Sequence, residues 1–504
     1  MQLVQKLGDI TPVKKKNKGE IHKNIFAGLQ SLRRRFSMRR EEVHNSMNGE
    51  TTHTIAAVAT GLPGAIGILR LSGPEAVTVA AQAFQAADGK TLAEHPPRKL
   101  VYGSLLGPQG KVIDQIVCTY SRGPASYTGE DTAELQCHGS PLVLQMGLET
   151  LFALGARPAR PGEFTQRAFL NGRLDLTQAE AVVDLIDAQS REGVYQSAGQ
   201  LAGVLSRRVE EIYLGLVDLM AHFHAVLDYP DEDIDPFKEE QMIQSMSRAE
   251  RELEGLLATH RRGESLVNGL PCAIVGRPNA GKSSLLNALV GYDRAIVTDI
   301  PGTTRDTVEG RVRLGGVLLR LADTAGLRDS TDPIEQMGVE RSRAAMEQAA
   351  LILFLCDRSV PFLPEDAQLL TQAAACAPTV LVWNKSDLPP ATAPGLPLPE
   401  GVRVVEISAK TGQGLDALEQ TVADMAPHSN EESGALLTNA RQADAAKRAL
   451  ESVRLARQGL ELGYTPDAVL VDVENALSAL GELAGRSVRE DITARIFERF
   501  CVGK

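Results

Sequence analysis

The sequence predicts a multidomain chain that combines an α+β domain, a helical bundle and an inserted, mostly parallel α/β domain of the Ras-like P-loop kind. Three observations carry this prediction. Short apolar segments divided by turns fill residues 53–170, and Ala-, Leu-, Gln- and Glu-rich stretches of helical periodicity follow them. Over residues 270–425 apolar strands alternate with helices, as in a doubly wound parallel sheet.

Composition narrows the class of protein. The 504 residues suit two to four domains, and an apolar fraction of 43% suits an ordinary globular chain. Aromatic residues make up only 4%, with Trp383 the single tryptophan, which argues against a large base-stacking surface. No apolar run is long enough for a transmembrane helix or a secretory signal, and the six cysteines form no CxxC pair. We therefore expect a cytoplasmic protein without membrane contact, disulfides or structural zinc.

Charge separates the first 50 residues from the rest. They hold eleven Lys/Arg and five Asp/Glu, so the other 454 residues carry a net charge of −17. Such an acidic body is unsuited to nonspecific RNA binding over a broad surface, and any nucleic-acid contact should be local or supplied by a partner. Three interpretations of residues 1–50 stay open. They are a disordered basic extension, a targeting peptide, or residues that are not translated because translation begins at Met47.

The predicted elements follow in order along the chain. In the first domain, the turn at 61–64 divides two strands. We expect strands at 53–58, 66–71, 112–120 and 133–137, then a helix at 141–154. Helical periodicity fills 175–228, 238–262 and 436–500, on both sides of the α/β region, which indicates one bundle interrupted by an inserted domain. The predicted boundaries are 1–50 for the basic extension, 51–170 for the first domain, 171–267 and 429–504 for the two helical parts, and 268–428 for the inserted domain.

The inserted domain begins with a phosphate-binding loop. The apolar strand 272–275 runs into Gly276–Ser283, which fits the pattern GxxxxGK[ST], and a helix starts near Ser284. Glycines let backbone N–H groups converge on phosphate oxygens, and the helix N-terminus adds its positive dipole end. Lys282 should reach the β- and γ-phosphates, and the Ser283 hydroxyl should bind Mg²⁺.

Three further motifs follow strands in the order expected of a guanine-nucleotide site. Asp323 should hold Mg²⁺ through water, and the Gly326 amide should meet the γ-phosphate. The Asp387 carboxylate can accept two hydrogen bonds from guanine N1–H and N2–H₂, which adenine cannot supply. Backbone groups of the last motif can bind guanine O6. The predicted nucleotide-binding residues are Asn279, Ala280, Gly281, Lys282, Ser283, Ser284, Thr298, Thr303, Thr304, Asp323, Thr324, Ala325, Gly326, Asn384, Lys385, Asp387, Ser408, Ala409 and Lys410.

Hydrolysis needs a substitute for the usual catalytic glutamine. Leu327 stands after the DxxG motif, and an apolar side chain cannot orient water. Asn279 and the loop 298–303 can present oxygens to a monovalent cation beside the phosphates, where positive charge would stabilise the transition state. Thr304 is the expected second hydroxyl ligand of Mg²⁺. Glu335 is the best nearby carboxylate for the water, although the sequence alone favours a solvated residue at a helix start.

These residues together resemble the MnmE (TrmE) family of tRNA-modification GTPases over about 53–504. The resemblance is carried by the nucleotide motifs and by GILRLSG at 67–73, YTGED at 127–131 with Glu134, ARPGEFT at 159–165, RAFLNGRLDL at 167–176 and FCVGK at 500–504. It implies an N-terminal domain that dimerises and binds a one-carbon folate (5,10-methylene- or 5-formyl-tetrahydrofolate), and a helical domain into which the GTPase domain is inserted. It also implies a potassium-dependent GTPase.

The resemblance further implies partners and a product. With an FAD-containing MnmG (GidA) protein, in a heterotetramer, the homodimer would place a carboxymethylaminomethyl or aminomethyl group at C5 of the wobble uridine of certain tRNAs. By position it assigns potassium to Asn279, Thr298, Ile300 and Thr303, Mg²⁺ to Ser283 and Thr304, water orientation to Glu335, and folate contacts to Arg70, Glu134, Arg173 and Lys504. Arg173 stands where the family also uses Lys, so its folate assignment is weaker than those of the other three residues. Pro301 stands where the family also uses Ala; it stiffens the loop without removing a named ligand.

Two other functions compete with this one. A ribosome-assembly GTPase shares the potassium-type loop and the apolar Leu327, but it predicts a basic RNA-binding module after the GTPase domain. The chain instead ends in an acidic-to-neutral helical segment. A GTP-gated membrane-remodelling protein would need a lipid-binding element, and only the basic extension offers one.

Overall fold

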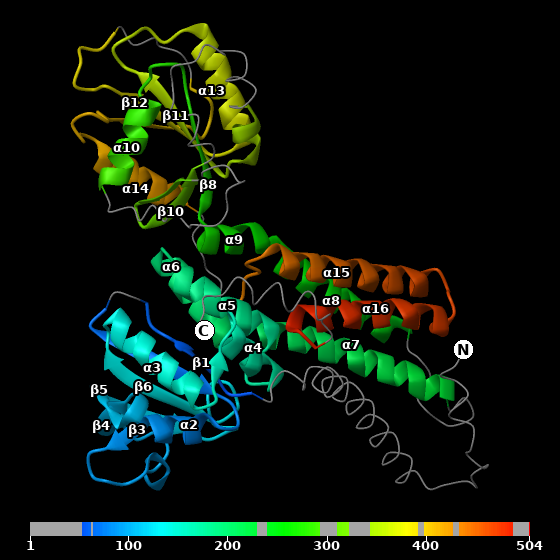
Figure 1. Cartoon of the computed structure of the whole chain (residues 1–504). Coiled ribbons are helices and arrows are strands. Elements are labelled where there is room, and N and C mark those ends of the chain that lie inside the picture. The colour runs from blue at the N-terminus through cyan, green and yellow to red at the C-terminus, as the bar shows by residue number, and fades with distance from the viewer. Residues whose placement is uncertain are drawn as a thin grey trace. The chain divides into compact units, whose positions relative to one another are not determined.

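The computed structural model describes residues 53–61, 64–228, 239–292, 310–321, 343–391, 398–426, 433–486 and 503 (Figure 1). The chain packs into two compact units. One comprises residues 1–180, 206–254 and 445–504, and the other comprises 181–205 and 255–444. Among the described helices, none combines the length and the apolar character needed to cross a bilayer.

The first unit contains a seven-stranded sheet in the order β3-β4-β5-β6-β2-β1-β7 (Figure 1). Neighbouring strands are antiparallel except for β1 and β7, which are parallel. The strands are β1 (Ile55–Val58), β2 (Ile66–Ser72), β3 (Phe84–Ala86), β4 (Val101–Leu106), β5 (Val112–Ser121), β6 (Thr132–His138) and β7 (Arg157–Pro158). The strands predicted in this domain from short apolar segments are confirmed as β1, β2, β5 and β6.

Alternation along these strands gives the sheet two different faces. In β6 every second residue is buried, as expected of a strand with one face on a core. The buried side chains, such as Leu69 and Leu135, pack with helices α2 (Ala76–Ala83) and α3 (Pro141–Ala153). The intervening positions carry Arg70 on β2 and Glu134 on β6, directly opposite each other in the register.

The helical part of the first unit brings together segments from both sides of the second sheet domain. Its long helices are α7 (Val204–Asp228), α8 (Glu239–Ala258), α15 (Ala440–Glu461) and α16 (Pro466–Ala484). Glu250 on α8 accepts hydrogen bonds from Arg454 and Arg457 on α15, at 2.8 and 2.9 Å. Apolar positions at helical spacing are buried, including Leu253, Val453 and Leu480. The prediction of a helical bundle built from two chain segments is confirmed.

The second unit carries a six-stranded sheet in the order β13-β12-β11-β8-β10-β9. All neighbouring strands are parallel except the edge pair β9 and β10. The strands are β8 (Leu270–Val275), β9 (Gly310–Leu314), β10 (Val317–Leu321), β11 (Leu351–Asp357), β12 (Thr379–Asn384) and β13 (Arg403–Glu406), and the helices include α10 (Lys282–Tyr292), α13 (Pro364–Cys376) and α14 (Leu415–Met425). This topology confirms the predicted Ras-like α/β fold.

The central strands of this sheet are buried on both faces. In β11 six consecutive residues, Leu351 to Cys356, are buried, because separate apolar clusters cover the two sides. A parallel sheet with helices on both faces requires such continuous apolar strands. The carboxyl ends of β8, β11 and β12 therefore lie along one edge of the sheet, and polar residues of the site begin there.

The chain leaves the second sheet domain through residues 433–439, which are bonded to helix α6 (Arg191–Leu201). The side-chain amides of Gln196 and Gln200 both donate to the Leu436 carbonyl, at 3.3 and 2.7 Å. Both glutamines are buried. The sequence predicted helix from 436, and this is wrong for 436–439: these backbone groups bond side chains instead, and α15 begins only at Ala440.

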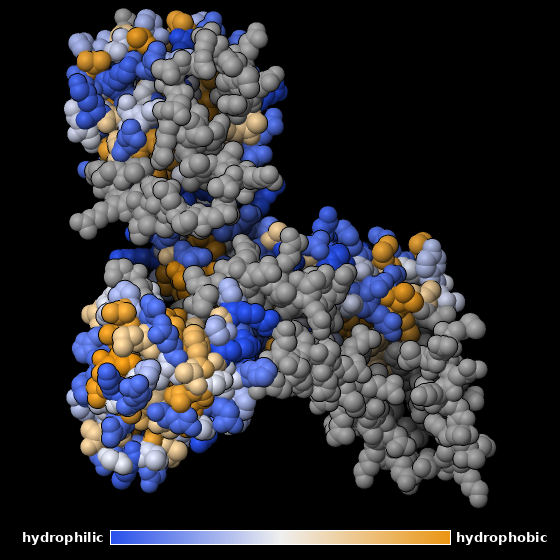
Figure 2. All heavy atoms as spheres, in the orientation of Figure 1, coloured by the Kyte–Doolittle hydropathy of each residue, from blue (hydrophilic) through white to orange (hydrophobic). Residues whose placement is uncertain are grey.

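Exposed apolar side chains are scattered over the surface of both units (Figure 2). On the seven-stranded sheet and its helices they include Ile66, Tyr102 and Leu142, each more than half exposed. Scattered exposed apolar residues are ordinary on a folded protein, so they do not by themselves define a binding surface.

A buried ion-pair network anchors helix α4 (Glu163–Leu170) to the seven-stranded sheet. Glu163 accepts hydrogen bonds from Arg157 at 2.9 Å, from the Arg160 amide at 2.9 Å and from Arg167 at 3.0 Å. Arg167, itself almost fully buried, also pairs with Glu130 at 2.8 Å. Burial would raise the pKa of Glu163, but these bonds and the charge of Arg167 outweigh it and lower its pKa to about 2.

We expect Glu163→Gln to weaken the first unit at neutral pH and to remove part of its acid sensitivity. Because the folded-state pKa lies below the ordinary 4.5, the carboxylate contributes fully above that pH, and its contribution of about 3 kcal/mol is lost as the pH falls towards 2. Hydrogen exchange of peptides covering α4 should be faster in the variant at pH 7, and the difference should shrink at pH 3. Fluorescence of Trp383, which lies in the second unit, provides an internal control that should not change. Equal exchange at pH 7 would contradict the prediction.

Candidate functional site

The phosphate loop has the strand–loop–helix context that the motif requires. Strand β8 ends at Val275, residues 276–281 form the loop, and α10 begins at Lys282. Arg277 anchors the loop to the start of α13, because its Nε lies 2.6 Å from Asp366 Oδ1. The loop is therefore held between β8 and α10 and tied to α13, and it leads into a helix N-terminus, which favours binding of an anion.

Two glycines permit this loop path. Gly276 and Gly281 have φ values of 152° and 98°, which side-chain-bearing residues rarely adopt. A Cβ on Gly281 would lie 2.3 Å from Asn384 Nδ2, and one on Gly276 would lie 2.1 Å from the Leu355 carbonyl. Both positions therefore need glycine for close approach as well as for backbone conformation.

Lys282 folds back over its own loop. Its Nζ donates to the carbonyls of Gly276 and Arg277, at 2.7 and 2.8 Å. An ammonium group has three protons, so one remains for a phosphate oxygen. Burial lowers the pKa of Lys282 by disfavouring the charged ammonium, and a bound phosphate would oppose this effect by favouring the charged form.

Asn384 joins three of the four motifs through one side chain. Its Nδ2 donates to the Ala280 carbonyl in the phosphate loop at 2.9 Å, and its Oδ1 accepts from the Ala409 amide at 2.9 Å. The side chain is almost completely buried, so both bonds are shielded from water. The Ala409 amide belongs to the motif whose backbone groups are predicted to bind guanine O6. It is already engaged and would share its proton with that oxygen.

Asp387 and Ser408 form the guanine-selective corner. Ser408 Oγ donates to Asp387 Oδ1 at 2.7 Å and accepts from the Thr411 amide at 3.2 Å. Ser408 is fully buried, whereas Asp387 is exposed. The hydroxyl holds one carboxylate oxygen in place, and the exposed carboxylate retains lone pairs that can accept from N1–H and N2–H₂ of guanine.

Lys385, which lies between Asn384 and Asp387 in the chain, pairs with a carboxylate that the sequence prediction missed. Lys385 Nζ lies 2.5 Å from Asp357 Oδ2. Asp357 is the last residue of β11, and its other oxygen accepts from the Ser359 amide and hydroxyl at 2.8 and 2.6 Å. The available signal was position: an acidic residue that ends an apolar parallel strand lies at the edge where ligands bind.

The remaining predicted nucleotide residues fall into two groups. Asn279 is exposed and has φ of 64°, and Ser283, Ser284 and Lys410 lie on α10 and after β13. The others lie outside the described residues, so their assignments stay predictions: Thr298, Ile300, Thr303, Thr304, Asp323, Thr324, Ala325, Gly326 and Glu335.

A second cluster lies on the face of the seven-stranded sheet opposite α2 and α3. Arg70 Nε donates to Glu134 Oε1 at 2.9 Å, and its NH1 donates to the Gly503 carbonyl at 3.3 Å. The Arg70 guanidinium also lies 5.8 Å from the ring centroid of Phe164. Arg70 and Glu134 are partly exposed, so this pair can still meet a ligand.

The other predicted folate residues lie beside this cluster or outside the described chain. Arg173 Nε donates to the Ser126 carbonyl at 3.1 Å. The neighbouring Tyr127 hydroxyl shares a hydrogen bond with Thr165 at 2.9 Å, and burial raises the pKa of Tyr127, with the Arg70 charge acting in the opposite direction. Lys504 is outside the described residues, although it follows Gly503 directly.

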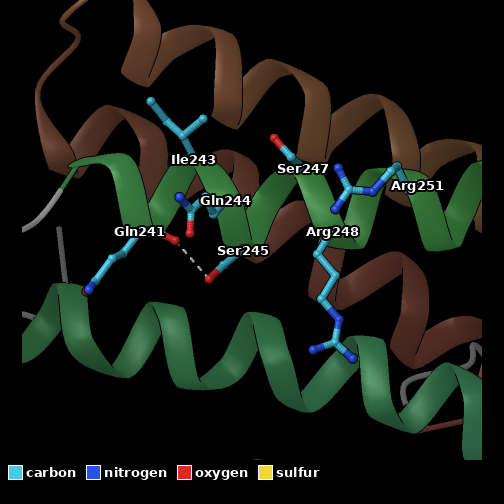
Figure 3. A pocket seen from close by; sticks show the side chains of 7 residues that line it. All are labelled: Gln241, Ile243, Gln244, Ser245, Ser247, Arg248 and Arg251. Carbon is cyan, nitrogen blue, oxygen red and sulfur yellow. Dashed lines mark hydrogen bonds between the residues drawn. The ribbon is translucent and has the colours of Figure 1, made fainter.

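A hollow along helix α8 belongs to neither of these two clusters. It has a volume of about 800 Å³ and is lined by residues of α8 between Gln241 and Arg251. Figure 3 shows Ser245 turned back to the Gln241 carbonyl, a bond of 3.0 Å. Of the seven lining residues only Ile243 is apolar, and none is a predicted site residue, so we assign it no ligand. Within the described residues, no group of His, Cys, Asp and Glu side chains is arranged to hold a metal ion.

The fold and the site define a P-loop GTPase, because a glycine-shaped phosphate loop and a carboxylate suited to guanine meet at the carboxyl edge of a Ras-like sheet. Two family models match the chain: the MnmE helical domain over residues 176–501 and the GTP-binding protein TrmE N-terminus over residues 54–173. The chain belongs to the MnmE family of tRNA modification GTPases.

Individual relatives agree with this assignment. The chain is 46% identical over 456 residues to the tRNA modification GTPase MnmE of Chloroflexus aurantiacus, covering 90% of this chain and 99% of that protein. It is 43% identical over 452 residues to the Thermus thermophilus protein of the same name, covering 89% and 99%. Among solved structures, the G domain of the T. maritima FeoB iron transporter matches 31% of this chain and 98% of its own at 25% identity, with a TM-score of 0.23. Aquifex aeolicus Era matches 36% and 66% at 28% identity, also with a TM-score of 0.23.

Proposed function

We propose that this chain is a potassium-dependent GTPase that modifies tRNA, adding a carboxymethylaminomethyl or aminomethyl group at C5 of the wobble uridine. The observation that carries the GTPase part is the joining of the phosphate loop, Asn384 and the Asp387–Ser408 corner in one site. The tRNA part rests on family membership, since relatives that align over 90% of this chain are named tRNA modification GTPases.

The metal assignments of the proposal use oxygen donors, which suit both ions. Ser283 and Thr304 would hold Mg²⁺, and Asn279, Thr298, Ile300 and Thr303 would hold K⁺ beside the phosphates. The exposed, left-handed Asn279 fits this role, because its side-chain oxygen is accessible from the loop surface. Bound there, the cations would supply positive charge to the transferring phosphate, while Glu335 would orient the attacking water.

The folate assignment fits the chemistry of the cluster on the first sheet. Arg70, Arg173 and Lys504 would offer cations to the glutamate carboxylate of a tetrahydrofolate, and Glu134 a carboxylate to its pterin edge. Glu134 uses one oxygen for Arg70, which leaves the other available as an acceptor. When bound, the folate would supply a one-carbon unit. The proposal includes a homodimer and an MnmG-like FAD protein as partners, in the cytoplasm.

The nucleoside profile of tRNA tests this proposal. In cells that lack the protein, mass spectrometry should show loss of C5-modified wobble uridines. Wild-type chain should restore them, whereas Glu335→Ala should not, because the modification depends on GTP hydrolysis. Glu347→Gln, which alters an exposed carboxylate of the second unit, serves as the matched control and should restore them fully.

Either of two outcomes would overturn part of the proposal. An unchanged profile in cells with no redundant copy would remove the tRNA function and make ribosome assembly the leading alternative. Full restoration by Glu335→Ala would leave the tRNA function in place but remove the water-orienting role of Glu335.

A further inference from the structure

Asp357 is an acidic residue at the end of β11, and its carboxylate directly contacts the guanine-binding loop. Its side chain is largely buried, at 13% exposure, while the Lys385 side chain is 33% exposed. The two are joined by the 2.5 Å bond between Lys385 Nζ and Asp357 Oδ2. The guanine-binding sequence motif does not include Asp357, because this motif begins 27 residues later, at Asn384.

Asp357 is itself held firmly. One oxygen accepts two hydrogen bonds from Ser359, at 2.8 Å from the amide and 2.6 Å from the hydroxyl. Burial would raise the pKa of Asp357, but the bonds from Lys385 and Ser359 outweigh it, so the pKa lies below its ordinary value. The carboxylate is therefore charged at neutral pH and fixed in direction, as a partner for a flexible ammonium must be.

Lys385 needs such a partner to adopt one conformation. Its backbone φ is 62°, in the left-handed region, and the Ser386 amide next to it is bonded to the Ile407 carbonyl at 3.0 Å. A free lysine side chain on an exposed loop samples many rotamers, and fixing it costs conformational entropy. The bond to Asp357 restricts those rotamers before any nucleotide binds.

We propose that Asp357 is a positioning residue for guanine: it holds Lys385 so that the methylene stem of this lysine packs against a face of the base whose edge binds Asp387. A lysine stem can cover an apolar or aromatic surface while its charged end stays bonded elsewhere. Asp357 acts only through Lys385 and does not touch the nucleotide. This inference rests on the proposed GTPase function.

Steady-state hydrolysis and nucleotide binding by the full-length protein test the inference. Asp357→Asn should raise the KM for GTP and the Kd for GDP about tenfold, with kcat within twofold of wild type, because only the base-binding part of the site is changed. Lys385→Ala should raise KM at least as much. In the Lys385→Ala background, Asp357→Asn should have no further effect, since the residue through which it acts is gone.

A matched control lies one residue away. Arg358→Gln breaks the 3.3 Å pair with Glu406, the last residue of β13, in which Lys385 takes no part, and it should leave KM unchanged. If the effects of Asp357→Asn and Lys385→Ala multiply in the double variant, or if kcat falls instead of KM rising, Asp357 has only a structural role and the inference is wrong. If wild-type protein binds no guanine nucleotide, the proposed function itself fails.

Discussion

Asp387→Asn should exchange the preferred purine of this protein from guanine to xanthine. The carboxylate accepts from both N1–H and N2–H₂ of guanine, whereas an asparagine amide in the same place accepts one bond and donates the other. Its N–H₂ would face the guanine amino group, donor against donor, but would bond the carbonyl that xanthine carries at C2. Because hydrogen bonds to charged groups contribute about 1.5–3 kcal/mol each, GTP affinity should fall about 100- to 1,000-fold.

Competition between GTP and XTP for a fluorescent nucleotide would measure this exchange. XTP should bind the variant more tightly than GTP, the reverse of the order in wild type. The Ser408 hydroxyl, which can donate or accept, should hold the amide as it holds the carboxylate at 2.7 Å. Asp424→Asn removes an exposed carboxylate on α14 and should leave the order unchanged. A variant that kept wild-type preference for GTP would show that guanine is selected elsewhere.

Lys282→Met should reduce kcat/KM for GTP hydrolysis by about a thousandfold. The lysine charge neutralises the phosphates in the transition state, and methionine keeps much of the stem without the charge. The free protein should stay folded, because burial already disfavours the charged form of Lys282, as its lowered pKa indicates. The two carbonyls that it now bonds, those of Gly276 and Arg277, would be left to water.

Hydrolysis rates together with thermal melts followed by Trp383 fluorescence would check both parts of this expectation. Lys447→Met, on the exposed side of α15, is the matched control and should leave kcat/KM and the melt unchanged. Near-normal hydrolysis by Lys282→Met would mean that other cations carry the phosphate charge. A lowered melting temperature would mean that the loop, and not the chemistry, depends on this lysine.

Much of the fold could be predicted from the sequence because it rests on local patterns. Short apolar segments divided by turns marked β1, β2, β5 and β6, and continuous apolar runs marked the central strands of the second sheet. The nucleotide motifs could be placed because each follows such a strand, and glycine at 276 and 281 is required by the backbone.

Other features could not be predicted because they depend on residues far apart in the chain. The Asn384 bonds to Ala280 and Ala409 require the folded sheet, and charged residues such as Glu163 and Arg167 resemble a solvated helix face until the partners are known. Residues 436–439 fit the helical pattern, but the buried glutamines of α6 donate hydrogen bonds to the Leu436 carbonyl instead. Tertiary contacts overrode local preference there.

The bonds from α6 to the Leu436 carbonyl also set the order in which the chain can fold during its synthesis. Gln196 and its acceptor are 240 residues apart. A ribosome adding roughly 5–20 residues per second needs roughly 12–48 s to cover that distance. During this interval the whole second sheet domain emerges while the amides of α6 still lack their partner. The nucleotide-binding domain therefore has time to fold first, and the bonds between the α6 glutamines and the segment that leaves this domain can form only afterwards.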